Sequence, residues 1–157
     1  MILSTVQRRG AWLLYYIFLA ALLAANSFGY LDPDFGWHLK VGETIAREKA
    51  VPSEQLYMWS LGEAHWVDHE WLSNLITYGL WSLGGYVAVS VFFILLPLIS
   101  LALINRYVFN NYLHKTREQV AFACFGTAAL FACLPHFGVR MQEFSFLFFS
   151  ILLIIID

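Results

Sequence analysis

Long apolar segments separated by short polar stretches dominate the pattern of this chain. Uncharged, strongly apolar runs cover residues 11–28, 86–104, 119–134 and 144–156. A helix needs about 20 predominantly apolar residues to cross a bilayer core that is about 30 Å thick. We therefore predict membrane-spanning helices over about 11–29, 86–105, 119–135 and 144–157, and an outer loop over residues 30–85.

A further apolar run, residues 71–83, is too short to be a span. Thirteen helical residues extend only about 20 Å at 1.5 Å per residue, and Gly84 and Gly85 then interrupt the pattern. We interpret residues 71–83 as a helix that lies at the membrane surface or is half inserted.

The polar stretch before that run also contains a helical pattern. Trp37, Val41 and Ile45 recur every four residues and therefore share one side of a helix. Pro52 disfavours helix at the residue before it, so this helix is predicted over residues 35–48, lying in the interface plane. The predicted fold class is all-α, a polytopic transmembrane protein with about four spans and two interfacial helices in the first outer loop.

Composition supports a membrane protein. The chain of 157 residues is 60% hydrophobic and 13% charged, against about 45–50% and about 25% in soluble domains. No basic run indicates nucleic-acid binding. Cys124 and Cys133 lie in one apolar segment, and we interpret them as small hydrophobic residues.

The basic residues predict the orientation. Arg8 and Arg9 precede the first predicted span, and Arg106, Lys115 and Arg117 lie between the second and the third. Cytoplasmic loops are enriched in lysine and arginine, and all five basic residues fall in the cytoplasm if residues 71–83 do not cross. We therefore predict a multi-pass protein of the cytoplasmic membrane with a cytoplasmic N-terminus, residues 29–70 outside and residues 105–118 inside.

Both ends of the chain allow a second interpretation. Arg8 and Arg9 could be the n-region of a cleaved signal peptide, but the following run is longer than a usual h-region and further spans follow. An uncleaved helix is therefore favoured. At the other end, the apolar run stops at Asp157 after thirteen residues, short of a full span. We expect the chain to be the N-terminal transmembrane part of a single, larger membrane domain.

The first polar cluster of the outer loop contains two carboxylates and an imidazole. Asp34 and His38 are four residues apart and share one helix face, and Asp32 lies just upstream. A carboxylate near the membrane surface can act as a general base toward a hydroxyl or amine, so Asp34 and Asp32 are candidate catalytic residues. The structural alternative is that Asp34 is an N-cap and Asp32 a turn residue before proline.

The second polar cluster comprises His65, Asp68, His69 and Glu70. Nitrogen and oxygen ligands of this kind can bind a divalent cation, for which Asp34, His38 and His69 are candidates. A zincin motif is excluded because Ser73 stands where its second histidine belongs. The alternative is a polar cap that hydrogen-bonds the loop.

Arg140 follows the third predicted span on the outer side. Its guanidinium could bind a phosphate through two parallel hydrogen bonds. The alternative is that it extends along the helix end to reach lipid headgroups.

Several of these residues form a pattern that resembles a known family. The matching residues are the run Asp32-Pro33-Asp34-Phe35-Gly36-Trp37-His38-Leu39, then Gly42, Pro52 and His69-Glu70-Trp71-Leu72. The pattern resembles bacterial integral-membrane glycosyltransferases of the GT-C fold, which are distant relatives of protein O-mannosyltransferases and of the aminoarabinose transferases that act on lipid A. The resemblance covers roughly residues 10–150. Arg140-Met141-Gln142 is similar to an Arg-Pro-Gln element of such sequences, with Met141 in place of the proline.

The resemblance implies a transferase that takes its sugar from a polyprenyl-phosphate donor and passes it to a lipid, glycan or protein acceptor. It also implies an essential acid in the first outer loop, which maps onto Asp34 and secondarily onto Asp32. His38, His69, Glu70 and Arg140 are then the candidates for binding the substrate and its phosphate. Two other functions stay open: a transporter fragment with an acidic outer loop, and a non-catalytic membrane protein. Few charges lie within the spans, which argues against transport.

Overall fold

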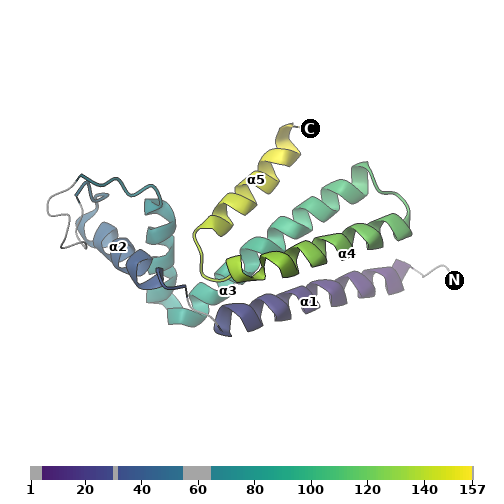
Figure 1. The fold of residues 1–157 in the computed structure, drawn as a ribbon, viewed down its shortest axis with the longest axis horizontal. Coiled ribbons are helices and arrows are strands. Elements are labelled where there is room, and N and C mark those ends of the chain that lie inside the picture. The colour runs from purple at the N-terminus through teal and green to yellow at the C-terminus, as the bar shows by residue number, and fades with distance from the viewer. Residues whose placement is uncertain (1–4, 30–31, 55–64, 157) are drawn as a thin grey trace. The chain divides into compact units, whose positions relative to one another are not determined.

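The computed structural model describes residues 5–29, 32–54 and 65–156 (Figure 1). They form α1 (Thr5–Gly29), α2 (Phe35–Glu48), α3 (Trp71–Asn111), α4 (Thr116–Cys133), the 3-10 helix η1 (Leu134–His136) and α5 (Gln142–Ile156). These described ranges contain no strand, only an isolated bridge between Glu54 and His65. The all-α prediction is confirmed, and so is the helix over 35–48. Residues 55–64 of the predicted outer loop lie outside the described residues.

The predicted interruption at Gly84 and Gly85 is confirmed within α3. Gly84 has φ −157° and ψ 22°, and Gly85 has φ 58° and ψ −150°, so the helical backbone breaks between residues 71–83 and 86–111. The Gly85 combination is one that essentially only glycine adopts. The second part of α3 ends at Asn111 rather than at the predicted residue 105.

The chain divides into two compact units. The loop unit is Asp32–Val89 and holds α2 and the first part of α3. The bundle unit is Met1–Leu31 together with Ser90–Asp157, and its described residues hold α1, the second part of α3, α4 and α5.

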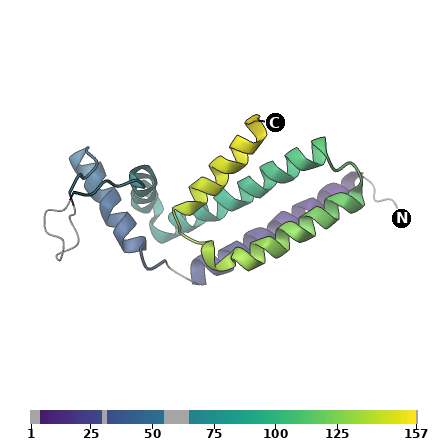
Figure 2. The same ribbon diagram turned by 45° about the horizontal axis from the view of Figure 1, so that its top comes forward.

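In the bundle unit, α1 and α4 lie side by side and run in the same direction (Figures 1 and 2). The Tyr15 hydroxyl donates a hydrogen bond to the Ala123 carbonyl at 3.3 Å, and further along both helices the Asn26 amide donates to the Leu134 carbonyl at 3.1 Å. Apolar packing between these helices and α3 forms the centre of the unit, where the buried residues are Leu19, Leu23, Ile94 and Leu130.

Three segments of the described chain are long and apolar enough to cross a membrane: Arg9–Phe28, Trp71–Asn111 and Thr116–His136. Within α3, residues 86–111 alone extend about 39 Å at 1.5 Å per residue, enough for a bilayer core. The helix α5 is apolar but shorter. Large apolar side chains face outward, with Leu13 63%, Phe125 77% and Ile155 73% exposed. Water-soluble proteins rarely expose large apolar patches, so the protein is a helical membrane protein.

In the loop unit, α2 packs against residues 71–83 in antiparallel order. Phe35 at the start of α2 contacts Trp81, with ring centroids 5.6 Å apart. Further along α2, Gly42 meets Asn74 and Tyr78 so closely that an added Cβ would lie 2.8 Å from the Tyr78 Cβ. Glycine at position 42 therefore sets the distance between the two helices.

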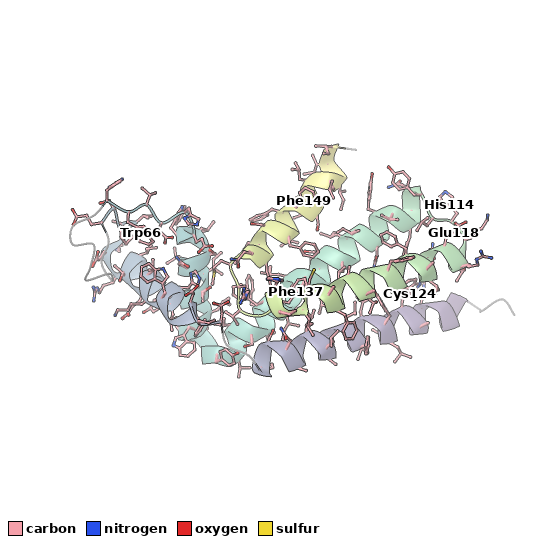
Figure 3. The ribbon with its side chains drawn as sticks, viewed as in Figure 1. Trp66, His114, Glu118, Cys124, Phe137 and Phe149 are labelled. Carbon is pink, nitrogen blue, oxygen red and sulfur yellow. The ribbon has the colours of Figure 1, made fainter. Side chains whose placement is uncertain are left out.

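A second contact holds the segment around Trp66 against α2. The Trp66 backbone N–H donates to the Ser53 carbonyl at 3.0 Å, which brings residues 53 and 66 together. The Trp66 ring, labelled in Figure 3, lies edge-on to Trp37 of α2 with centroids 5.6 Å apart. The predicted apolar stripe of α2 is also partly buried within the protein, because Val41 and Ile45 are at most 5% exposed.

Candidate functional site

The start of α2 holds two carboxylates with different roles. The Asp32 Oδ1 atom accepts a hydrogen bond from the Asp34 backbone N–H at 2.9 Å, and the Asp32 carbonyl accepts one from the Phe35 N–H at 3.0 Å. Asp32 therefore shapes the turn that leads into the helix. Asp34 occupies the N-cap position, yet its side chain makes no capping hydrogen bond and the residue is exposed. The structural alternative is confirmed for Asp32, whereas Asp34 stands at the N-cap position but its side chain makes no capping bond.

His38 lies one turn further along α2 and reaches across to α3. Its Nδ1 atom is 2.8 Å from the Asn74 Oδ1 atom and 3.7 Å from the Glu70 Oε2 atom. The side chain is 13% exposed. From the second polar cluster, Glu70 comes close to His38, while His69 is exposed and forms no hydrogen bond or ion pair with His38 among the described residues.

Asp68 anchors this group from the turn before α3. One carboxylate oxygen, Oδ1, accepts the Glu70 backbone N–H at 2.9 Å, and the other, Oδ2, accepts the Asn74 side-chain amide at 2.8 Å. Asp68 is 3% exposed and Asn74 is fully buried. A buried carboxylate and amide are stable only when hydrogen-bonded, and here both are.

On the outer side of α2, Lys40 and Glu43 form a separate, exposed pair. The Lys40 Nζ atom lies 2.7 Å from the Glu43 Oε2 atom. The hydrogen bond from this ammonium lowers the pKa of the Glu43 carboxyl. This pair belongs to the solvated face of the helix, and exposed pairs contribute little to stability.

The candidate metal ligands do not come together at one point. Asp34, His38 and His69 do not converge, and the described residues contain no group of three or more histidine, cysteine, aspartate or glutamate side chains that could hold a metal ion. His65 is exposed and pairs through its backbone with Glu54. The described geometry therefore gives no support to a divalent-cation site.

Arg140 belongs to the bundle unit, in the turn that joins η1 to α5. Its backbone N–H donates to the Gly138 carbonyl at 3.0 Å, and its carbonyl accepts the Glu143 N–H at 3.2 Å. The Glu143 Oε1 atom accepts the Gly138 N–H at 2.8 Å. Asn26 of α1 reaches the same turn, through the carbonyls of Leu134 and of Phe137, which Figure 3 labels. Arg140 therefore lies in a turn whose backbone is fixed by hydrogen bonds that involve Glu143 and Asn26.

Sequence reasoning missed Asn74, and it noted Asp68 only as a neighbour of other ligands. A signal was present, because Asn74 is an amide residue inside a mostly apolar helical run, one turn after Glu70. Such a residue on a helix that packs against protein has to find polar partners. Its partners could not be named without the contact between α2 and α3.

Comparison with known proteins adds no relative. No protein-family model, no curated protein and no solved structure matches the chain.

Proposed function

We propose that the protein is a membrane glycosyltransferase that moves a sugar from a polyprenyl-phosphate donor to an acceptor hydroxyl outside the cytoplasmic membrane. Two kinds of observation support the proposal. One is the resemblance of residues 32–39 and 69–72 to GT-C enzymes. The other is that Asp34, His38 and Glu70, which come from these two motifs, belong to one folded unit.

One observation carries the proposal: Asp34 is exposed and its carboxylate is not used by the helix that it begins. An aspartate at an N-cap position normally accepts a backbone N–H. In this turn Asp32 accepts the Asp34 N–H instead. A carboxylate that stays available in solvent, one turn from an imidazole, can remove a proton from a bound hydroxyl.

The proposed reaction inverts the sugar at its anomeric carbon. The acceptor oxygen forms a bond to that carbon while the bond from the carbon to the donor phosphate oxygen breaks. The hydroxyl proton passes to Asp34, and the electron pair of the broken bond stays on the phosphate. His38 would donate a hydrogen bond to this phosphate, because stabilising developing charge is usually the largest catalytic contribution. His69, which belongs to the same unit, remains a candidate phosphate ligand.

Glu70 has a different part in this proposal. Its Oε2 atom lies 3.7 Å from His38 Nδ1, so the carboxylate faces the ring nitrogen that already pairs with Asn74. Glu70 would therefore support His38 rather than touch the phosphate itself, since two anions repel.

The predicted topology places the loop unit where such a donor would be used. The proposal includes a cytoplasmic N-terminus and a loop unit on the outer face of the cytoplasmic membrane. Exposed Arg9 at the start of the first span agrees with this orientation. The lipid part of the donor would lie in the membrane beside the spans.

A non-catalytic protein is the second candidate, and one observation favours it. Asp68 and Asn74 are buried and hydrogen-bonded to one another and to their neighbours, as in a polar network that only holds two helices together. The exposure of Asp34 is what this alternative does not explain.

The test is turnover of a defined donor. The full chain, purified and reconstituted in liposomes, is incubated with undecaprenyl-phosphate donors that carry different radiolabelled sugars, together with a cell-envelope extract as acceptor. We expect release of undecaprenyl phosphate from one class of donor, with label appearing in the acceptor fraction. Stability of every donor in the presence of folded protein would contradict the proposal and favour the non-catalytic alternative.

A further inference from the structure

The atoms around His38 Nδ1 determine which ring nitrogen carries the proton. Both neighbours of Nδ1 are oxygen atoms, the Asn74 Oδ1 at 2.8 Å and the Glu70 Oε2 at 3.7 Å. A carboxylate oxygen only accepts hydrogen bonds when ionised. If Asn74 also presents its oxygen, Nδ1 has to be the donor, and the neutral imidazole then has its lone pair on Nε2.

Asp68 decides which way the Asn74 amide points. The Asp68 carboxylate is an acceptor at both oxygens, and its Oδ2 atom lies 2.8 Å from the Asn74 Nδ2 atom. Rotating the Asn74 amide by half a turn would set two oxygen atoms against each other. The amide nitrogen therefore faces Asp68, and the amide oxygen faces His38.

We propose that Asp68 is a positioning residue that acts through Asn74 to hold the proton of neutral His38 on Nδ1, so that Nε2 is the nitrogen that takes up a second proton and then donates to a phosphate oxygen of the donor. The phosphate part rests on the proposed function, whereas the proton position does not. Among the described residues, His38 Nε2 makes no hydrogen bond. Protonation of His38 would then create an Nε2–H donor, while Nδ1–H stays bonded to Asn74.

The arrangement makes an unusual prediction for an isosteric variant. In Asp68→Asn, the side-chain oxygen of residue 68 still has to accept the Glu70 N–H, so its new amide nitrogen faces Asn74. Asn74 must then turn its oxygen toward residue 68 and its nitrogen toward His38. Nδ1 becomes an acceptor, and the proton of neutral His38 moves to Nε2.

A second substitution should reverse this change. In Asp68→Asn with Asn74→Asp, the new amide nitrogen at position 68 donates to one carboxylate oxygen at position 74. The other carboxylate oxygen faces His38, so Nδ1 again has to donate. The double variant keeps one carboxylate and one amide of nearly the same shape and exchanges them between positions 68 and 74.

The test is the 15N spectrum of the histidines in the full chain in nanodiscs at alkaline pH, where imidazoles are neutral. His38→Gln identifies the His38 signals, and exposed His69 is the internal control. We expect protonated Nδ1 in the wild type, protonated Nε2 in Asp68→Asn, and protonated Nδ1 again in the double variant. His69 should not change.

Phosphate binding is read in the same samples at neutral pH. Undecaprenyl phosphate added to the nanodiscs should produce a doubly protonated His38 in the wild type and in the double variant, whereas in Asp68→Asn the neutral ring already carries Nε2–H and should bind with Nδ1 still unprotonated. A wild-type protein in which neutral His38 carries its proton on Nε2 would overturn the proposal, and this result needs no variant. An Asp68→Asn spectrum like that of the wild type would also overturn it. A correct proton position without sugar transfer would instead contradict the proposed function alone.

Discussion

The contact at Gly42 allows a quantitative prediction about the loop unit. In Gly42→Ala, the new Cβ would lie 2.7 Å from the Asn74 carbonyl carbon and 2.8 Å from the Tyr78 Cβ, and it would overlap the Asn74 carbonyl oxygen. Carbon atoms pack best at about 3.5–4.0 Å, so α2 and residues 71–83 would have to separate by about 1 Å. Two of the atoms belong to the backbone of α3 and cannot rotate away.

Two opposing effects set the magnitude. Overpacking typically costs about 1–3 kcal/mol and occasionally more, while alanine in a helix interior gains about 1 kcal/mol over glycine. Since rigid backbone atoms meet the new Cβ, we expect the upper part of the overpacking range and a net loss of about 1–2 kcal/mol. Separation of the helices should also lengthen the His38–Asn74 hydrogen bond, which is 2.8 Å in the structure.

Gly79→Ala is the matched control, because Gly79 lies in the same pair of helices and an added Cβ there meets nothing within 4 Å. That variant should be unchanged or stabilised by up to about 1 kcal/mol. The assay is hydrogen exchange at the α2 amides of the full chain in nanodiscs, with thermal unfolding by circular dichroism as a second measurement. Equal protection of α2 in the two variants would refute the account of this contact.

Three further predictions concern the backbone, the bundle unit and the topology. Gly85→Ala should destabilise the fold by about 1–3 kcal/mol, because its φ of 58° and ψ of −150° suit only glycine; thermal unfolding measures this. Asn26→Ala leaves two carbonyls of the η1 turn without their amide donor and should cost about 1–3 kcal/mol, seen as faster proteolysis at that turn. In intact cells, an impermeant thiol reagent should label Ser53→Cys and spare Thr116→Cys; the reverse pattern would contradict the predicted orientation.

Periodicity and breakers predicted the helices well where local sequence determines the structure. The stripe that begins at Trp37 and the proline at position 52 fixed the bounds of α2, which the structure places at Phe35–Glu48. The glycine pair at 84 and 85 marked the break in α3, because few other residues adopt that backbone.

The end of α3 was predicted too early because tertiary contacts extend it. Beyond residue 104 the sequence turns polar, which normally favours a loop. In the structure, Asn105 donates a hydrogen bond to the Tyr16 hydroxyl at 2.9 Å, and Phe109 packs on Trp12 with centroids 5.1 Å apart. These partners are about 90 or more residues away in the chain, so local pattern could not reveal them.

The candidate site was predictable in its residues and only partly in its geometry. Helix spacing placed Asp34 and His38 on one face, and Glu70 of the second polar cluster lies 3.7 Å from His38 Nδ1. Asn74 was missed because its role depends on how closely α2 and α3 approach, which the glycine at position 42 permits. Aspartate is a favoured N-cap residue, and Asp34 does occupy that position, but its side chain makes no capping bond. The side-chain hydrogen bond in this turn comes from Asp32, whose carboxylate accepts the Asp34 N–H.

The most direct test of the central claim compares sugar transfer by Asp34→Asn and Asp32→Asn in the full, reconstituted chain. Asp34 makes no capping bond, so the asparagine removes a base without removing a helix contact. Asn at position 32 can still accept the N–H of residue 34, which makes it the matched control. We predict a loss of about 10²–10⁴-fold in transfer for Asp34→Asn, with normal insertion and folding, and a much smaller effect for Asp32→Asn. Undiminished transfer by Asp34→Asn would contradict the account.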